Sequence, residues 1–417
     1  MVWAGWAGDG VHGKQGWGVV WCVQRFAGCC GGGAGEWLEW RAEGWRIEGM
    51  MERRQLVAMW RRGEAATLVT LVRTEGSSYR RPGARLLVGA DGGHAGTISG
   101  GCLETEVVRK SGWKVREGAV VERYSTLFDD TAELPFGLGC GGVVDLLLEP
   151  VGTPECAALM GAIEASLAGQ KWTVVTWLPG EGRSLRRVVM DADGAVVFAS
   201  EGLGAKKLAC VSGLRAGEEY EGRFVEEIKP LQRLFVLGAG DDAKPLVQMA
   251  ALLGWRVTVA EGRAQWARRE RFPEAEEVRV VTAVEELGIG SEDAVVLMTH
   301  SYEQDRALLA GLLGVMPRYL GVLGARHRSS LLVSEAAVMK GLTVEECCAR
   351  LYAPVGLDLG GDGPEAIALA VIAEAQACVQ GKLGASRRLG AAEVAEQIAK
   401  GGTSRYLQVQ CAMDEAQ

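Results

Sequence analysis

Residues 234–243 read LFVLGAGDDA, an apolar run followed by two closely spaced glycines and two aspartates. This pattern predicts a strand that turns into a helix at Gly238 and Gly240, with the GxGxxA spacing of a turn that binds the pyrophosphate of a dinucleotide. Toward the C-terminus, apolar runs alternate with helical segments over 256–260, a helix from 264, 278–282, 294–300, a helix from 301, and 319–324. Such alternation predicts a parallel sheet covered by helices on both faces, and therefore a Rossmann-like domain over residues 230–385.

One feature of this domain favours the binding of a dinucleotide, and another argues against it. Glu261 ends the next predicted strand, about 20 residues past the glycines, where a ribose-binding acid would belong. Asp241 and Asp242, however, place two carboxylates where a pyrophosphate would rest, and they compete with it for the helix N-terminus. The sequence therefore predicts the fold and leaves NAD(P) binding open.

His300 is a further site candidate in this domain. It ends a predicted strand, and residues 301–304 (SYEQ) form a capping box for the next helix. Ligands bind at the carboxyl ends of parallel strands, which favours a functional His300. The alternative is a neutral histidine that is hydrogen-bonded to the backbone.

Composition limits the function classes. The 417 residues include 45 basic and 53 acidic side chains, so no basic excess exists to hold nucleic acid. No apolar run reaches the roughly 18 residues of a membrane-spanning helix. The eleven cysteines form no CxxC pair and the four histidines are scattered, which favours reduced thiols in the cytoplasm over disulfides or zinc. We expect a cytoplasmic α/β protein.

Residues 1–49 differ from the rest. They hold seven of the thirteen tryptophans among many glycines, without a helical or strand period. We expect either a disordered leader or a start codon assigned too far upstream, with initiation at Met50 or Met51, and we assign no function to this segment.

The middle of the chain is a second α/β region. Periodicity predicts helices and strands that make an N-terminal domain over 51–152 and a bridging segment over 153–229, and we expect a helical or frayed tail over 386–417. The expected helices span 52–63, 103–110 and 155–168, and the expected strands span 65–73, 85–90, 94–99, 120–125, 143–149, 172–178 and 186–190.

The strongest chemical candidate of the N-terminal domain is SGGC at residues 99–102. Here a predicted strand ends, Gly100 and Gly101 turn the chain, and Cys102 begins a helix. The partial positive charge of a helix N-terminus lowers a thiol pKa, which favours the thiolate that binds metals and attacks sulfur. The alternative is a tight turn with a small buried cysteine.

Two other segments accompany this turn. Residues 73–85, RTEGSSYRRPGAR, hold Arg80, Arg81 and Arg85, whose guanidinium forks match phosphate oxygens. Residues 136–142, FGLGCGG, surround Cys140 with glycines before a strand. Solvated surface charge and an incidental cysteine are the plain alternatives.

At these segments the sequence resembles the xanthine dehydrogenase accessory protein family, XdhC/CoxI. The matching stretches occur in the family's order and cover most of 51–380: RTEGSSYRRPGARLLV, GTISGGCLETEVV, ELPFGLGCGGVVDLLLEP, LFVLGAGDDAKPLV, VLMTHSYEQD, YLGVLGARHRSSLL and APVGLDLGGDGPEAIALAVIAE. The resemblance implies an N-terminal family domain followed by a Rossmann domain. It places the family's cofactor-linked cysteine at Cys102 and its second, glycine-flanked cysteine at Cys140.

The resemblance also implies a function. Family members bind molybdenum cofactor, protect it during sulfuration and insert it into a molybdenum hydroxylase. On this basis Cys102 is a candidate molybdenum ligand, and the expected partners are a hydroxylase apoenzyme and a cysteine desulfurase. We further expect a homodimer that acts as a chaperone rather than as an enzyme.

Two alternatives stay open. An NAD(P)-dependent oxidoreductase would use His300 as its acid–base group, but it leaves SGGC and FGLGCGG without a role. A thiol relay enzyme would carry a persulfide on Cys102.

Overall fold

The computed structural model describes residues 52–76, 78–101, 103–125, 142–204, 208, 210–216 and 222–384. Cys102 and Cys140 lie outside the described residues, as do the expected leader over 1–49 and the expected tail over 386–417. Within the described part, no helix combines the length and apolar character needed to cross a membrane.

An antiparallel sheet forms the first layer of the N-terminal region. Its strand order is β3-β2-β1-β5-β4, and apolar side chains on both faces of the central strands are buried. The helices α1 and α3 pack on one face and α2 on the other. The elements are α1 (Glu52–Arg61), β1 (Ala65–Gly76), β2 (Arg85–Gly89), β3 (His94–Gly96), α2 (Glu104–Lys114), β4 (Val120–Ser125), β5 (Gly142–Pro150) and α3 (Pro154–Leu167).

A second antiparallel sheet follows, with strand order β8-β7-β6-β9. It contains β6 (Trp172–Trp177), β7 (Arg186–Met190), β8 (Val196–Ala199) and β9 (Arg223–Ile228). Residues of α1, α3 and both sheets share one hydrophobic core. Strand β9 was not predicted from the sequence, because its residues (RFVEEI) carry charges whose counter-ions lie on other segments of the chain.

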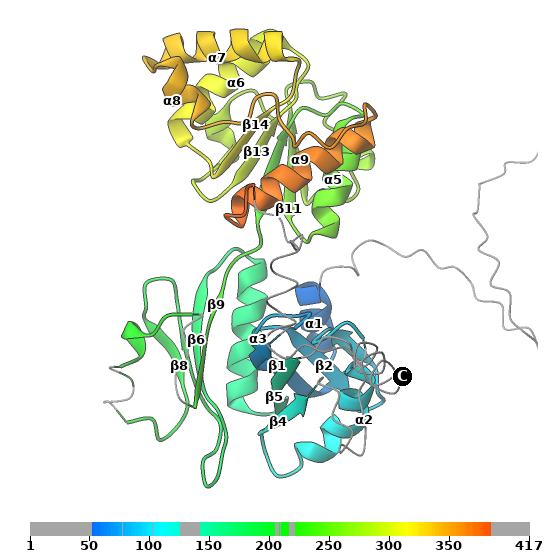
Figure 1. The fold of residues 1–417 in the computed structure, drawn as a ribbon, viewed down its shortest axis with the longest axis vertical. Coiled ribbons are helices and arrows are strands. Elements are labelled where there is room, and N and C mark those ends of the chain that lie inside the picture. The colour runs from blue at the N-terminus through cyan, green and yellow to red at the C-terminus, as the bar shows by residue number, and fades with distance from the viewer. Residues whose placement is uncertain are drawn as a thin grey trace, which may run out of the picture. The chain divides into compact units, whose positions relative to one another are not determined.

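The C-terminal region is a parallel five-stranded sheet, with order β12-β11-β10-β13-β14. Helices α5 and α9 pack on one face, and α6 and α7 on the other (Figure 1). This confirms the predicted Rossmann-like domain. Its elements are β10 (Arg233–Leu237), α5 (Ala243–Leu252), β11 (Arg256–Glu261), β12 (Glu277–Val280), β13 (Ala294–Leu297), α6 (Tyr302–Val315), β14 (Tyr319–Val322), α7 (Arg326–Lys340), α8 (Val344–Cys348) and α9 (Pro364–Val379).

The helix expected from residue 264 is wrong. The segment between β11 and β12 contains a single short 3₁₀ turn, Arg269–Arg271. Pro273 removes a backbone donor and disfavours a helix interior. The buried Phe272 and Ala275, with the partly buried Trp266, anchor this segment to the core without helical spacing.

The order of the parallel strands creates a switch point between β10 and β13. The chain moves outward from β10 to β11 and β12, and then returns to β13 on the other side of β10. Loops that leave neighbouring strands in opposite directions open a crevice at their carboxyl ends, where ligands of such sheets bind. Gly238 follows β10 and His300 follows the segment after β13 at this point.

Candidate functional site

The arginine-rich loop and the SGG turn lie against each other. A Cβ placed on Gly100 would lie 3.8 Å from the ring of Tyr79, so the ring lies next to the backbone of Gly100. Arg80 donates to the carboxylate of Glu52 at 2.8 and 2.5 Å, and the same carboxylate accepts from the backbone N–H of Thr97 at 3.4 Å. Glu52 of α1 therefore joins the loop to the segment that leads into the turn.

A buried carboxylate organises the turn. Glu104 accepts hydrogen bonds from the backbone N–H groups of Ile98 at 3.1 Å, Ser99 at 2.7 Å and Gly101 at 3.1 Å, and from the Ser99 hydroxyl. The Ser99 oxygen in turn accepts from the N–H of Leu103 at 3.2 Å. Gly101 has φ +107°, a backbone conformation that residues other than glycine rarely adopt. Glu104 was not among the residues predicted for the site, although its position two residues after SGGC was a signal.

The charge of Glu104 bears on the expected thiolate. Burial disfavours the carboxylate, but the hydrogen bonds from Ser99, Ile98 and its own turn outweigh this and hold the pKa of Glu104 below its usual value. A fixed anion in the turn opposes a second negative charge nearby. The lowered pKa of Cys102 stays a prediction, because this residue lies outside the described residues.

Replacing Glu104 with glutamine should lower the free energy of unfolding by about 1–3 kcal/mol at pH 7, because buried donors lose a charged acceptor. The folded-state pKa is lowered, so the stabilisation is present above the unfolded value of about 4.3 and is lost as the pH falls through the folded pKa. Urea unfolding at several pH values measures both effects.

The control is Glu117→Gln, which removes an exposed carboxylate beyond the same helix. It should leave the unfolding free energy within about 0.5 kcal/mol of wild type. A difference between Glu104→Gln and wild type that stays constant down to pH 3 would contradict the assignment.

The three predicted arginines have different environments. Arg80 is paired with Glu52, as described above. Arg85 is buried, pairs with Glu226 of β9 and donates to the Gly83 carbonyl at 3.0 Å. Arg81 is exposed, and none of the described residues pairs with its guanidinium.

Two cavities adjoin the arginine-rich loop. The larger has a volume of about 910 Å³, and the smaller about 440 Å³. Both are lined by Arg53, Pro82, Gly83 and Arg85, so the two cavities adjoin each other at this part of the loop. Tyr79, Arg80 and Arg81 line the smaller cavity. A ligand can therefore reach the loop from either cavity.

The switch point of the Rossmann domain collects the other candidates. A Cβ on Gly240 would lie 3.2 Å from His300 Nε2, and this nitrogen is 2.9 Å from Asp242 Oδ2. His300 has φ 61°, an unusual conformation for a residue with a side chain. The structure thus brings Gly240 and His300 together, with Asp242 between the glycine-rich turn and the imidazole.

Glu261 differs from a ribose-binding acid. Its buried carboxylate accepts from the Ala239 N–H at 3.2 Å and from Arg263, whose Nε lies at 2.8 Å. Burial opposes the charge of Glu261, but the hydrogen bonds from Arg263 and Ala239 lower its pKa. The adjoining cavity has a volume of about 240 Å³, which is below the roughly 300 Å³ lower limit of usual ligand pockets. Both carboxylate oxygens of Glu261 thus accept hydrogen bonds from neighbouring residues of the protein itself.

The described cysteines fit reduced thiols. Cys156, Cys210, Cys347, Cys348 and Cys378 are all free. Burial raises the pKa of the Cys156 thiol, which makes it unreactive. Within the described ranges, no group of three or more histidine, cysteine, aspartate or glutamate side chains is placed to hold a metal ion.

Comparison with known families identifies the chain. The model of the XdhC and CoxI family matches residues 59–125, and that of the XdhC Rossmann domain matches residues 234–375. The chain belongs to the XdhC and CoxI family. This confirms the resemblance noted in the sequence, and the two matched ranges contain the arginine-rich loop, the SGG turn and the switch point.

Relatives of this family member extend over most of its length. It is 27% identical over 328 residues to a probable xanthine dehydrogenase subunit of Bacillus subtilis (strain 168), covering 75% of this chain and 92% of that protein. It is 24% identical to the molybdenum cofactor insertion chaperone PaoD of Escherichia coli (strain K12), covering 75% and 83%. A crystal structure of a xanthine dehydrogenase from Bacillus halodurans matches with TM-score 0.68 and 28% identity, covering 81% of this chain and 98% of that one.

Proposed function

We propose that this protein binds molybdenum cofactor as cargo, supports its sulfuration and inserts it into a xanthine dehydrogenase-type molybdenum hydroxylase. The relative PaoD is named as a molybdenum cofactor insertion chaperone, and the Bacillus subtilis relative carries the name of xanthine dehydrogenase. The observation that carries the proposal is the contact between the arginine-rich loop and the SGG turn through Tyr79 and Gly100, beside two cavities.

The residues around this contact suit the chemistry of the cargo. Molybdenum cofactor combines a flat pterin, a metal held by sulfur and a terminal phosphate. Tyr79 is 74% exposed, so its ring offers a face on which a pterin stacks. Arg81 lines the same cavity as Tyr79 and supplies a cation there, and in this proposal Cys102 and Cys140 supply soft sulfur ligands.

The other residues have positioning roles. Glu52 holds Arg80 and the approach to the turn, while Glu104 fixes the turn itself. A chaperone must release its cargo, and one exposed ring with a few exposed charges suits moderate affinity. The proposal includes a cytoplasmic homodimer without an enzymatic activity of its own, a cysteine desulfurase as sulfur donor and a hydroxylase apoenzyme as acceptor.

The test is the molybdenum and pterin content of the full chain purified from a host that makes the cofactor. We expect wild type to retain both, and Cys102→Ser to lose at least 80% of the molybdenum, which corresponds to roughly 1 kcal/mol or more of lost affinity. Metal analysis and pterin fluorescence measure the two components separately.

The matched control is Cys348→Ser, which changes an exposed cysteine in α8 of the Rossmann domain. It should load like wild type. Equal loading of Cys102→Ser and Cys348→Ser would remove Cys102 from the site, and an empty wild-type protein would overturn the function. A sulfur adduct on Cys102 in mass spectrometry, without bound cofactor, would favour a thiol relay instead.

An NAD(P)-dependent oxidoreductase has less support. The carboxylate of Glu261 accepts hydrogen bonds from the Ala239 N–H and from Arg263, so it is not free to bind the hydroxyl groups of a ribose. The chaperone proposal therefore expects no saturable thermal shift with NADH.

A further inference from the structure

The walls of the larger cavity come from several segments of the N-terminal region. Residues of α1, β1, β4, β5 and β9, of the arginine-rich loop and of the turn between β6 and β7 line its volume of about 910 Å³. Usual ligand pockets have volumes of about 300–1,000 Å³. The space therefore suits an organic molecule of the size of a nucleotide or a pterin.

The acidic side chains that line the cavity are already neutralised. Asp145 pairs with Arg123, whose Nε lies at 2.7 Å. Glu226 pairs with Arg85, and Glu227 pairs with Lys171. These carboxylates therefore leave no free negative charge to repel an anionic ligand.

Three lining arginines have no such counter-charge within the described part of the chain. They are Arg73 on β1, Arg223 at the start of β9 and Arg183 in the turn between β6 and β7. Among the residues that the structure describes, no hydrogen bond or ion pair holds any of their guanidinium groups. Arg73 and Arg223 are half-buried and Arg183 is exposed. Their charges converge on one cavity from separate segments.

The inner wall strengthens the positive potential. Arg53 and Arg85 both line the cavity, and Arg53 donates to the Lys229 carbonyl at 2.6 Å. Burial, and then the charge of Arg85, lower the pKa of Arg53, while Glu226 opposes this effect. The ion-pair partner of the buried Glu226 is Arg85, so the charge of Arg53 is only partly offset, and an anion in the cavity would relieve the excess of positive charge.

We propose that the larger cavity binds the phosphate or pyrophosphate group of an organic ligand through Arg73, Arg183 and Arg223. Guanidinium forks hold phosphate oxygens bidentately, and half-buried arginines do so with less solvent screening. The identity of the ligand rests on the proposed function: it is the phosphate end of the pterin cargo or of a nucleotide attached to it. The binding of the anion itself does not depend on that function.

The experiment is a calorimetric titration of the full chain with inorganic pyrophosphate at 50 mM and 300 mM NaCl. We expect saturable binding that weakens with salt, and at least 10-fold weaker binding to Arg73→Gln/Arg223→Gln. The control is Arg116→Gln/Arg268→Gln, which removes the same charge from exposed positions outside the cavity. It should bind pyrophosphate within twofold of wild type.

Equal weakening in both double variants, or no saturable binding to wild type, would overturn the site. If the double variant unfolds, the single variants Arg73→Gln and Arg223→Gln decide, each with an expected loss of at least threefold. Titrations with CDP and GDP identify the source of the phosphate, because tighter binding of either than of pyrophosphate indicates a nucleotide.

Pyrophosphate binding and molybdenum loading are separate measurements. Pyrophosphate binding without any molybdenum loading would overturn the proposed function and support the anion site. If wild-type protein instead loads molybdenum but does not bind pyrophosphate, the anion site is overturned and the proposed function is supported.

Discussion

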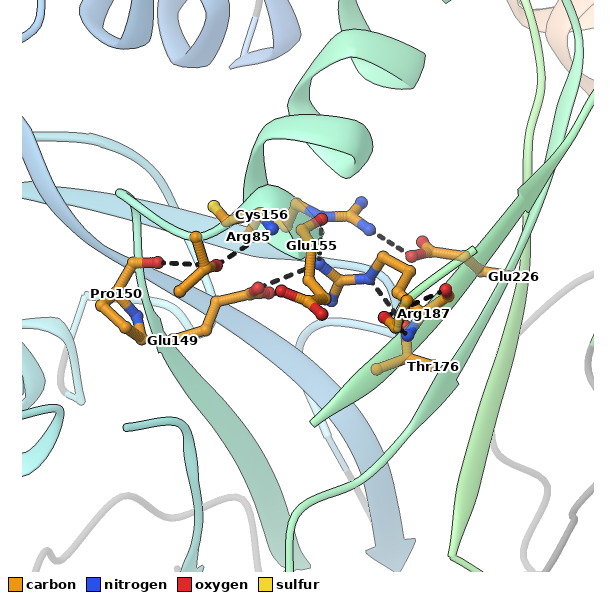
Figure 2. Close-up of polar contacts among 10 residues, drawn as sticks. Arg85, Glu149, Pro150, Glu155, Cys156, Thr176, Arg187 and Glu226 are labelled. Carbon is orange, nitrogen blue, oxygen red and sulfur yellow. Dashed lines mark hydrogen bonds and ion pairs between the residues drawn. The ribbon is translucent and has the colours of Figure 1, made fainter. Parts of the chain in front are cut away.

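Replacing Arg187 with methionine is expected to lower the free energy of unfolding by about 3–5 kcal/mol, since it leaves a buried carboxylate without its counter-ion. Arg187 of β7 is 1% exposed and pairs with Glu149 of β5, with two N–O distances of 2.9 Å (Figure 2). Its guanidinium also donates to the Glu155 carbonyl at 2.7 Å and to the Thr176 hydroxyl at 3.1 Å. The pair therefore joins the two antiparallel sheets through their shared interior.

A double variant separates the charge from the packing. Glu149→Leu/Arg187→Met should recover at least half of the loss, because the uncompensated charge is gone. Arg61→Met breaks an exposed pair with Glu164 and should cost about 0–1 kcal/mol. Urea unfolding followed by circular dichroism compares the three variants. A cost below 1 kcal/mol for Arg187→Met alone would show that water reaches Glu149.

These buried pairs mark the limit of prediction from the sequence. Arg85 and Glu226 are 141 residues apart, and Arg187 and Glu149 are 38 apart. Nothing local in the chain says that Arg85 is neutralised, so the sequence predicts its guanidinium to be free for phosphate. That Arg73 and Arg223 have no partner among the described residues was equally hidden in the sequence, because it depends on which carboxylates the fold pairs with other cations.

Local patterns predicted the Rossmann domain well. Buried parallel strands are continuous apolar runs, and the turn after β10 carries its glycines in sequence. The same rules failed at 264–275, where tertiary packing of Trp266 and Phe272 replaces helical periodicity. They also failed at β9, whose charged side chains need partners on other segments.

The site was predictable in its parts and not in its assembly. SGGC and the arginine-rich loop stood out by residue type, but the contact of Tyr79 with Gly100 and the nest of N–H groups around Glu104 required the fold. The roles of Cys102 and Cys140 stay predictions.

Replacing Gly238 with alanine is expected to lower the free energy of unfolding by about 3 kcal/mol or more, from backbone strain and overpacking together. Gly238 has φ +127°, and an added Cβ would lie 2.2 Å from the Met298 carbonyl oxygen and 2.9 Å from the Thr299 nitrogen. Both contacts are backbone of the neighbouring strand segment, which cannot swing aside as a side chain does. Hydrogen exchange of the β10 and β13 amides, together with urea unfolding, measures the effect.

The control for Gly238 is Gly288→Ala, since Gly288 also has a positive φ, +61°, but has open space around its Cβ position. It should cost about 1–2 kcal/mol, the strain of a left-handed residue alone. The comparison decides why this glycine stands in a dinucleotide-type turn. A large excess cost for Gly238→Ala, in protein free of any nucleotide, shows that the close approach of β10 to β13 requires the glycine. If the two variants lose the same free energy of unfolding, packing does not require the glycine, and contact with a ligand is the reason for a glycine at this position.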